Sequence, residues 1–352
     1  MSTVSSVLRT LPAGVERELP APSYVYRDGL HAGLAVESMR RHMTDEGWQI
    51  FDGLSMAGYR LFGKGLGHSE TDVQKIVSQY DPAVVVMQDK REWDVIPGDF
   101  RDPDAKFHNV DVLKNMADVF RVTVLKDSHQ RTRYHMQSAE EIGCHAWITY
   151  YHSDLVKHLA SYVRKEHLIR TYHTIDRHVV PQFNRQRADR ALLSGAVSRF
   201  YPERVEMVKN LRSYRRVDWH RHPGYHVNGT NTPEFMRLLS NYKVAICTTS
   251  MYGYALRKII EATACGCVVI TDLPSDDVMP SIDGNLIRMP RYDVRRRLAM
   301  RQEYSEAIQR AVDSYDHEKQ AHFAELAVNE YCHIRQGHIL ADKIDHLRRE
   351  YA

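Results

Sequence analysis

A regular alternation of short apolar segments with longer amphipathic segments runs through most of this chain, and it constrains the fold more than any other feature. Residues 83–87 (AVVVM) are apolar and β-branched, as in a strand buried on both faces, and residues 73–80 before them fit a helix. Strand–helix–strand order with short connections is typical of a parallel sheet covered by helices. The alternation therefore predicts an α/β fold.

The first alternation occupies the N-terminal half. Residues 1–20 lack periodicity and read as an extended arm, whereas Ser69 and Asp72 resemble a helix-opening cap ahead of residues 73–80. Strands are predicted at residues 23–26, 48–51, 83–87, 121–125 and 146–149. Helices are predicted at residues 34–43, 73–80, 112–119 and 139–142.

A polar, arginine-rich stretch at residues 181–190 breaks the pattern and reads as an interdomain linker, after which a second alternation begins. Strands are predicted at residues 191–194, 244–248 and 268–271, and helices at 203–212 after Pro202, at 235–242 after Thr232-Pro233-Glu234, at 255–264 and over most of 294–351. We expect two Rossmann-like parallel-sheet domains facing a central cleft, residues 1–184 and 185–320. Residues 321–352 should form a helical C-terminal tail that packs back toward the first domain.

The composition agrees with a two-domain globular protein, since the 352 residues are 43% hydrophobic and 26% charged. No apolar run approaches the roughly 20 residues that a membrane span needs, and the N-terminus lacks a signal-peptide pattern. The five cysteines are scattered and odd in number, so a disulfide framework is not expected. These features favour a cytoplasmic location.

The net charge of +3 is mild, but the arginines are clustered. The clusters are Arg185, Arg187 and Arg190; Arg212, Arg215 and Arg216; and Arg295, Arg296 and Arg297. They suit a polyanionic partner such as a nucleotide diphosphate or nucleic acid, or else they are solvated helix faces.

The segment of residues 250–272 (SMYGYALRKIIEATACGCVVITD) carries the clearest chemical signal. Gly253 lies just ahead of a helix whose free N–H groups favour anions. Lys258 and Glu261 are three residues apart and share a helix face, so the cation can meet a phosphate while the carboxylate accepts hydrogen bonds from ribose hydroxyls. A solvated Lys–Glu pair is the alternative. Cys265-Gly266 ends the helix ahead of an apolar strand.

A second segment, residues 194–199 (SGAVSR), follows a predicted strand and precedes the helix that Pro202 opens. A small loop with Ser198 and a basic neighbour can hold phosphate oxygens, and Arg204 adds a guanidinium that binds phosphate bidentately. Its position one strand–helix unit into the second domain predicts a phosphate loop.

These two segments resemble the donor domain of GT-B glycosyltransferases, especially CgeB-like enzymes and the DNA β-glucosyltransferase of T-even phages. Glu261 matches the glutamate that binds the donor ribose in this family. Lys258 stands where a basic residue, usually arginine, contacts the diphosphate. Ser198 and Arg204 match the spacing of the phage enzyme's phosphate loop. Gly253 occupies the position of a second glutamate in the retaining branch, which favours an inverting reaction.

The resemblance implies a nucleotide-diphosphate sugar donor, with a UDP-sugar as the expected form and no strictly required metal. The predicted donor-binding residues are Ser194, Gly195, Ser198, Arg199, Arg204, His222, Tyr225, Ser250, Gly253, Tyr254, Lys258 and Glu261. His220, His222 and His226 could also be considered a zinc site, but no Cys or carboxylate cluster accompanies them. Asp102-Pro-Asp104 is taken as a turn rather than a metal motif.

The catalytic base should follow a strand of the first domain and face the donor. Asp127 follows the predicted strand at residues 121–125, as the catalytic aspartate of the phage enzyme follows a strand of bulky apolar residues. His129 is a possible assistant, and His31 matches the first-loop position of the catalytic histidine in plant-type GT-B enzymes. Asp89 follows a third strand.

The acceptor side is predicted at Asp89, Lys90, Arg91 and Trp93, where cations and an aromatic residue suit a DNA backbone and an extruded base. The favoured acceptor is a 5-hydroxymethylpyrimidine in double-stranded phage DNA, in the host cytoplasm. The CgeB resemblance favours a surface glycan or protein instead. A non-catalytic nucleotide-binding protein is the alternative of another class.

Overall fold

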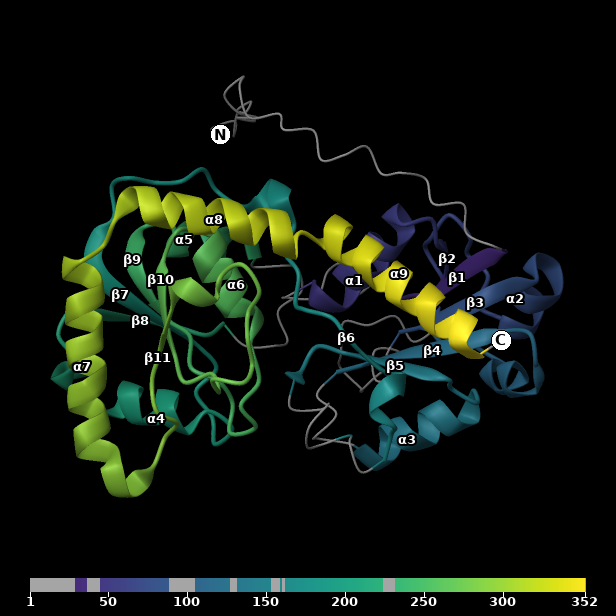
Figure 1. The fold of residues 1–352 in the computed structure, drawn as a ribbon, viewed down its shortest axis with the longest axis horizontal. Helices are drawn as coiled ribbons and strands as arrows, with labels where there is room; N and C mark the ends of the chain where they lie inside the picture. Colours follow the sequence, from purple (N-terminus) through teal and green to yellow (C-terminus); the bar gives the residue numbers. More distant parts are fainter. Residues whose placement is uncertain are drawn as a thin grey trace, which may run out of the picture.

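A computed structural model describes the chain over residues 29–36, 45–88, 105–126, 132–152, 159, 162–223 and 232–351. Its helices and strands form two α/β bodies side by side, joined by one long C-terminal helical region (Figure 1). None of the described helices combines the length and apolarity that crossing a membrane requires.

The first body contains a parallel sheet of six strands in the order β2-β1-β3-β4-β5-β6. Its strands are β1 (Leu30–Leu34), β2 (Arg60–Phe62), β3 (Pro82–Met87), β4 (Phe120–Leu125), β5 (Ala146–Thr149) and β6 (Leu168–Arg170). β3 and β4 are buried along nearly their whole length, because helices cover both faces of a parallel sheet.

The second body contains a parallel sheet of five strands in the order β11-β10-β9-β7-β8. Its strands are β7 (Ala188–Gly195), β8 (Val217–Arg221), β9 (Tyr242–Ile246), β10 (Val268–Thr271) and β11 (Leu286–Arg288). The chain passes between the two bodies along the segment from β6 to β7. The predicted architecture of two parallel-sheet α/β domains is therefore confirmed.

The helices lie between the strands and at the C-terminus. They are α1 (Glu46–Met56), α2 (Val73–Tyr80), α3 (Thr132–Glu141), α4 (Pro202–Lys209), α5 (Thr232–Leu239), α6 (Arg257–Ala264), α7 (Arg297–Asp313), α8 (His317–Tyr331) and α9 (His333–Tyr351). α8 packs against α6 of the second body, and α9 then crosses to the first body and packs against α1 (Figure 1). The expected helical C-terminal tail is thus present.

Two glycines allow α1 and α9 to approach closely. A methyl group at Gly53 would lie 2.3 Å from the His333 carbonyl oxygen, and one at Gly337 would lie 2.1 Å from the Gly53 carbonyl carbon. Only hydrogen fits at either position. The backbones of the two helices therefore touch where the C-terminal region reaches the first body.

Several predicted elements are confirmed and others are wrong. α2 and β10 have the predicted bounds, and the Asp72 carboxylate caps α2 by accepting from the Gln74 N–H at 3.0 Å. The strand predicted at residues 48–51 is part of α1. Of the helix predicted at residues 34–43, Leu34 is the last residue of β1, residues 35 and 36 are not helical, and residues 37–43 lie outside the described part of the chain. The helix predicted at 112–119 is a 3₁₀ turn at Val110–Asn115. The strand predicted at 23–26 lies outside the described residues.

The errors have a physical reason. Trp48, Ile50, Phe51 and Leu54 are all buried along one side of α1, but four consecutive residues are too few to distinguish a helical period from a strand. Ala35 and Val36 are fully buried beyond β1, and a strand buried on both faces lacks the alternation that identifies strands.

Candidate functional site

The C-terminal ends of four neighbouring strands bring the predicted donor residues together in the second body. Gly195 ends β7 and pairs with Arg221 of β8, so His220 and His222 lie at the same edge of the sheet. Thr248 follows β9 and Asp272 follows β10. Ligands of open parallel sheets bind at this edge.

Gly195 is the point where two cations meet. A methyl group on Gly195 would lie 2.3 Å from Lys258 Nζ and 2.5 Å from Arg204 Nη1, and its φ of +110° is a conformation that glycine adopts without strain. The segments of residues 194–199 and 250–272, predicted separately to bind phosphate, thus converge on one residue. A small backbone position flanked by an ammonium and a guanidinium is suited to an anion.

Arg204 is fixed by several contacts although it is nearly fully buried, at 1% exposed. Its Nη1 donates to the Ala196 carbonyl oxygen at 2.8 Å, and its Nη2 donates to the Thr248 carbonyl oxygen at 2.9 Å. Its guanidinium also lies 4.3 Å from the centre of the Tyr201 ring. These contacts hold the Arg204 guanidinium in one orientation at the C-terminal ends of the strands.

The electrostatics around Gly195 are dominated by positive groups. Burial and the neighbouring Arg204 guanidinium lower the pKa of the half-buried Lys258. Burial, together with Lys258, Arg204 and His220, lowers the pKa of His222 to about 4. Like charges close together in a partly desolvated site disfavour protonation of one another. An anion bound there would relieve this repulsion.

Glu261 lies one turn along α6 from these cations and is 6% exposed. Its carboxylate pairs with Arg257, whose Nε is 3.2 Å from Glu261 Oε1. Lys258 points toward Gly195 instead. The residue of α6 that pairs with Glu261 is thus Arg257 and not Lys258. The sequence did not indicate this contact of Arg257.

The loop ahead of α6 adopts a compact turn. Gly253 has a φ of +73°, its N–H donates to the Ser250 carbonyl oxygen at 2.8 Å, and the Arg291 guanidinium donates to the carbonyl oxygens of Ser250 and Met251. Tyr254, predicted to bind the donor, is 2% exposed and stacks on Tyr151 of the first body with ring centres 3.8 Å apart. This ring is thus committed to the contact between the domains.

The remaining predicted donor residues lie near this edge or outside the described part. Ser194 is buried at the end of β7, Ser198 Oγ accepts from the Phe200 N–H at 3.3 Å, and Arg199 is exposed above the Phe200 ring. Tyr225 and His226 lie outside the described residues.

His31 does not lie in a loop after the first strand, and this expectation was wrong. It is the second residue of β1, 2% exposed, and its Nε2 lies 2.7 Å from Asp345 Oδ1 of α9. Its ring packs edge-on against Tyr59. β1 continues for three residues beyond His31, and the His31 imidazole contacts α9.

The other predicted residues of the first body lie outside the described part of the chain. These are Asp127 and His129 on the catalytic side and Asp89, Lys90, Arg91 and Trp93 on the acceptor side. In the sequence, the acceptor-side residues come after β3 and the catalytic-side residues come after β4.

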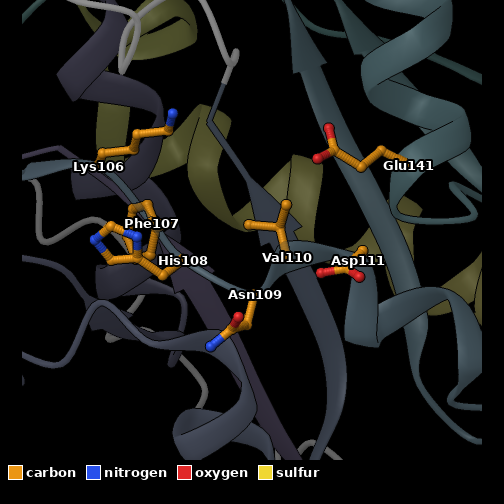
Figure 2. A pocket seen from close by; sticks show the side chains of 7 residues that line it. All are labelled: Lys106, Phe107, His108, Asn109, Val110, Asp111 and Glu141. Atoms are coloured by element: carbon orange, nitrogen blue, oxygen red, sulfur yellow. The ribbon is translucent and has the colours of Figure 1, made fainter.

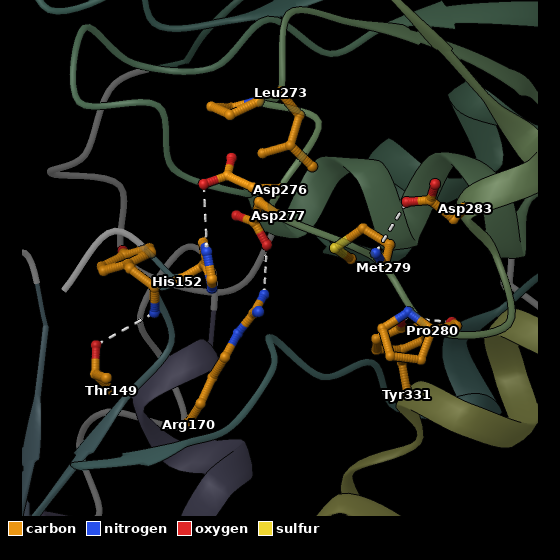
Figure 3. Close-up of polar contacts among 12 residues, drawn as sticks. Thr149, His152, Arg170, Leu273, Asp276, Asp277, Met279, Pro280, Asp283 and Tyr331 are labelled. Atoms are coloured by element: carbon orange, nitrogen blue, oxygen red, sulfur yellow. Dashed lines mark hydrogen bonds and ion pairs between the residues drawn. The ribbon is translucent and has the colours of Figure 1, made fainter. Parts of the chain in front are cut away.

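Polar contacts join the two bodies at the loop that follows β10 (Figure 3). Arg170, at the end of β6, pairs with Asp277 at 2.5 Å, and His152 pairs with Asp276 at 3.5 Å. Burial raises the pKa of Asp277, while Arg170 counteracts this by favouring the carboxylate. Arg288 donates to Asp283 and to the Asp277 carbonyl oxygen, which fixes the loop after β10.

A separate hollow of about 210 Å³ lies in the first body, and none of the predicted site residues lines it (Figure 2). Its lining is Lys106, Phe107, His108, Asn109, Val110, Asp111 and Glu141. The charges around it have both signs, so it does not select anions. Among the described residues, no three His, Cys, Asp or Glu side chains gather as metal ligands.

Comparisons with known proteins agree with the fold. No protein-family model and no curated protein matches the chain. Among solved structures, Anabaena Alr3699/HepE in complex with UDP-glucose is similar with a TM-score of 0.55 at 12% identity, over 90% of this chain and 99% of that one. A glycosyltransferase from Rickettsia africae is similar with a TM-score of 0.52 at 9% identity, over 92% and 99%. The chain has the fold of GT-B glycosyltransferases.

Proposed function

We propose that this protein is a glycosyltransferase that takes its sugar from a nucleotide-diphosphate donor, in the first instance a UDP-sugar. The observation that carries the proposal is the convergence of Lys258 and Arg204 on Gly195 at the strand ends of the second sheet. Two further facts support it: a buried carboxylate, Glu261, lies one helical turn away, and the similar HepE structure contains UDP-glucose.

In this proposal the residues divide the work by charge. Lys258 and Arg204 hold the diphosphate and stabilise the negative charge that grows as it departs. Glu261 accepts hydrogen bonds from the ribose hydroxyls. The acceptor oxygen attacks the anomeric carbon as the bond from this carbon to the diphosphate breaks, so the configuration of the anomeric carbon is inverted. The acceptor proton passes to Asp127. Gly253, in place of a second glutamate, supports the inverting course.

For the acceptor we propose a 5-hydroxymethylpyrimidine in double-stranded DNA, on the resemblance to the phage enzymes and on the mixture of cations and aromatic residues at 89–93. The cytoplasm is the matching location. The CgeB resemblance supports a surface glycan or protein acceptor as the second candidate.

One experiment tests donor and acceptor together. The protein is incubated with a panel of nucleotide sugars and with hydroxymethylated or unmodified DNA, and the digested nucleosides are analysed by mass. The expected result is a hexose or pentose increment on the hydroxymethylpyrimidine alone. Transfer to glycans or protein but not to DNA would replace the acceptor, and no turnover of any nucleotide sugar would favour a non-catalytic nucleotide-binding protein.

The Asp127→Asn variant tests the base in the same assay. It keeps the shape of the side chain but cannot take up the acceptor proton, so turnover should fall by roughly 10²–10⁴ while donor affinity is unchanged. His31→Ala is the comparison, because His31 lies inside the first sheet. An active Asp127→Asn protein would exclude Asp127 as the base.

A further inference from the structure

Arg257 is a buried cation of the donor helix that touches carboxylates from both domains. It opens α6 and is 6% exposed. Its Nε lies 3.2 Å from Glu261 Oε1, and its Nη1 donates to Asp45 Oδ1 at 2.6 Å. Asp45 belongs to the first body and is separated from Arg257 by 212 positions in the sequence. One guanidinium thus joins the proposed ribose carboxylate to the opposite domain.

Asp45, the partner of Arg257 in the first body, does not cap the helix that it precedes. It precedes α1, where an aspartate normally accepts from the backbone of its own helix, but no such hydrogen bond forms. Its Oδ1 accepts from Arg257, and its Oδ2 accepts from Gln49 Nε2 at 3.1 Å. Thr174 Oγ1, in the segment that connects the sheets, donates to Gln49 Oε1 at 2.8 Å. The contacts form a continuous chain from Glu261 to the interdomain connection.

The side chains in this chain of contacts are largely shielded from solvent. The side chains of Arg257 and Glu261 are 6% and 7% exposed, and that of Asp45 is 21% exposed. Stacking of Tyr254 on Tyr151 packs the loop before α6 against the first body. Charges in such an environment interact more strongly than at a surface, and removing one redistributes the others.

We infer that Arg257 is a positioning residue, which shares its charge between Asp45 and Glu261 and thereby couples donor binding to the first domain. This inference rests on the proposed function, because it assigns Glu261 to the donor ribose. With Asp45 in place, part of the guanidinium is engaged by the first domain, and Glu261 can accept from ribose. When Asp45 loses its charge, Arg257 pairs with Glu261 alone and competes with the ribose hydroxyls.

The test is a double-mutant cycle on the dissociation constant of UDP, measured by calorimetry. Asp45→Asn, which does not touch the nucleotide, should weaken binding about fivefold or more in the wild-type background. In the Arg257→Gln background there is no cation to release, so the same substitution should change the dissociation constant by less than about twofold. No effect in the wild type, or an equal effect in both backgrounds, would overturn the inference.

Two further variants separate this coupling from a loosened domain junction. Asp277→Asn breaks a different interdomain ion pair, which involves Arg170 and no residue of α6, and should leave the UDP affinity unchanged. Arg257→Lys keeps a cation between the two carboxylates, so Asp45→Asn should weaken UDP binding in that background as well. If Asp277→Asn weakens UDP binding as much as Asp45→Asn does, the coupling through Arg257 is refuted. Failure of the wild type to bind UDP would instead refute the donor site itself.

Discussion

At the scale of single residues, the conformation of Gly195 decides whether the two cations can meet. A Cβ atom would collide with Lys258 Nζ and Arg204 Nη1, and the φ of +110° would be strained for any other residue. Gly195→Ala should therefore displace both cations, weaken UDP-glucose binding and destabilise the fold by about 1–3 kcal/mol. Calorimetry and urea unfolding measure the two effects.

The matched control for this change is Gly67→Ala, since no atom lies within 4 Å of a methyl group there. It should bind UDP-glucose as the wild type does. Normal UDP-glucose binding by Gly195→Ala would mean that Lys258 and Arg204 do not require glycine at position 195.

Protonation of His222 provides a second prediction at the residue scale. Its pKa of about 4 reflects burial and the positive charge of Lys258 and Arg204. A diphosphate between these groups favours the protonated imidazole, so the bound state holds more protons than the free state. Affinity for UDP-glucose should therefore rise as the pH is lowered from about 8 to about 6.

Calorimetry in two buffers of different ionisation enthalpy should detect proton uptake on binding. UDP-glucose is preferred to UDP here because its phosphates do not titrate near neutral pH. His222→Gln should take up fewer protons than the wild type. Proton release by the wild type would contradict the placement of the diphosphate among these cations.

At the scale of helices and strands, local signals predicted some elements and missed others. α2 was predictable because its cap, Asp72, and its apolar period are both local. α1 was misread because Trp48–Phe51 sit in a short apolar run, and the part of Arg257 was missed because its partner Asp45 is 212 positions away. Arg187, whose cluster suited either a polyanion or a solvated helix face, instead donates to the Tyr242 and Cys265 carbonyl oxygens. Contacts between distant segments leave no periodic trace in a sequence.

The α1–α9 contact gives a prediction whose sign is diagnostic. Replacing glycine by alanine inside a helix normally stabilises it by about 1 kcal/mol. At Gly337 the new methyl group would lie 2.1 Å from the Gly53 carbonyl carbon, so Gly337→Ala should lower the melting temperature. His346→Ala, an exposed change in the same helix, should have little effect. An unchanged or higher melting temperature for Gly337→Ala would show that α9 does not pack so closely.

At the scale of the whole molecule, the two domains meet through buried polar contacts as well as through α9. The Asp277 and Arg170 side chains are 3% and 16% exposed, so neutralising one leaves the other charge buried without its partner. Asp277→Asn should reduce the free energy of unfolding by about 3 kcal/mol, as judged by the urea midpoint. An unchanged midpoint would mean that water already solvates this contact.

The central claim is that the second domain holds a nucleotide-diphosphate sugar at Gly195, Arg204 and Lys258. The most direct measurement is a calorimetric titration of UDP-glucose into the wild type, Lys258→Met and Lys209→Met, the last being an exposed lysine of the same domain. We predict saturable binding to the wild type and to Lys209→Met, and a loss of about tenfold or more in Lys258→Met, because a charge-assisted contact is removed. No binding to the wild type, or equal binding by all three proteins, would contradict the account.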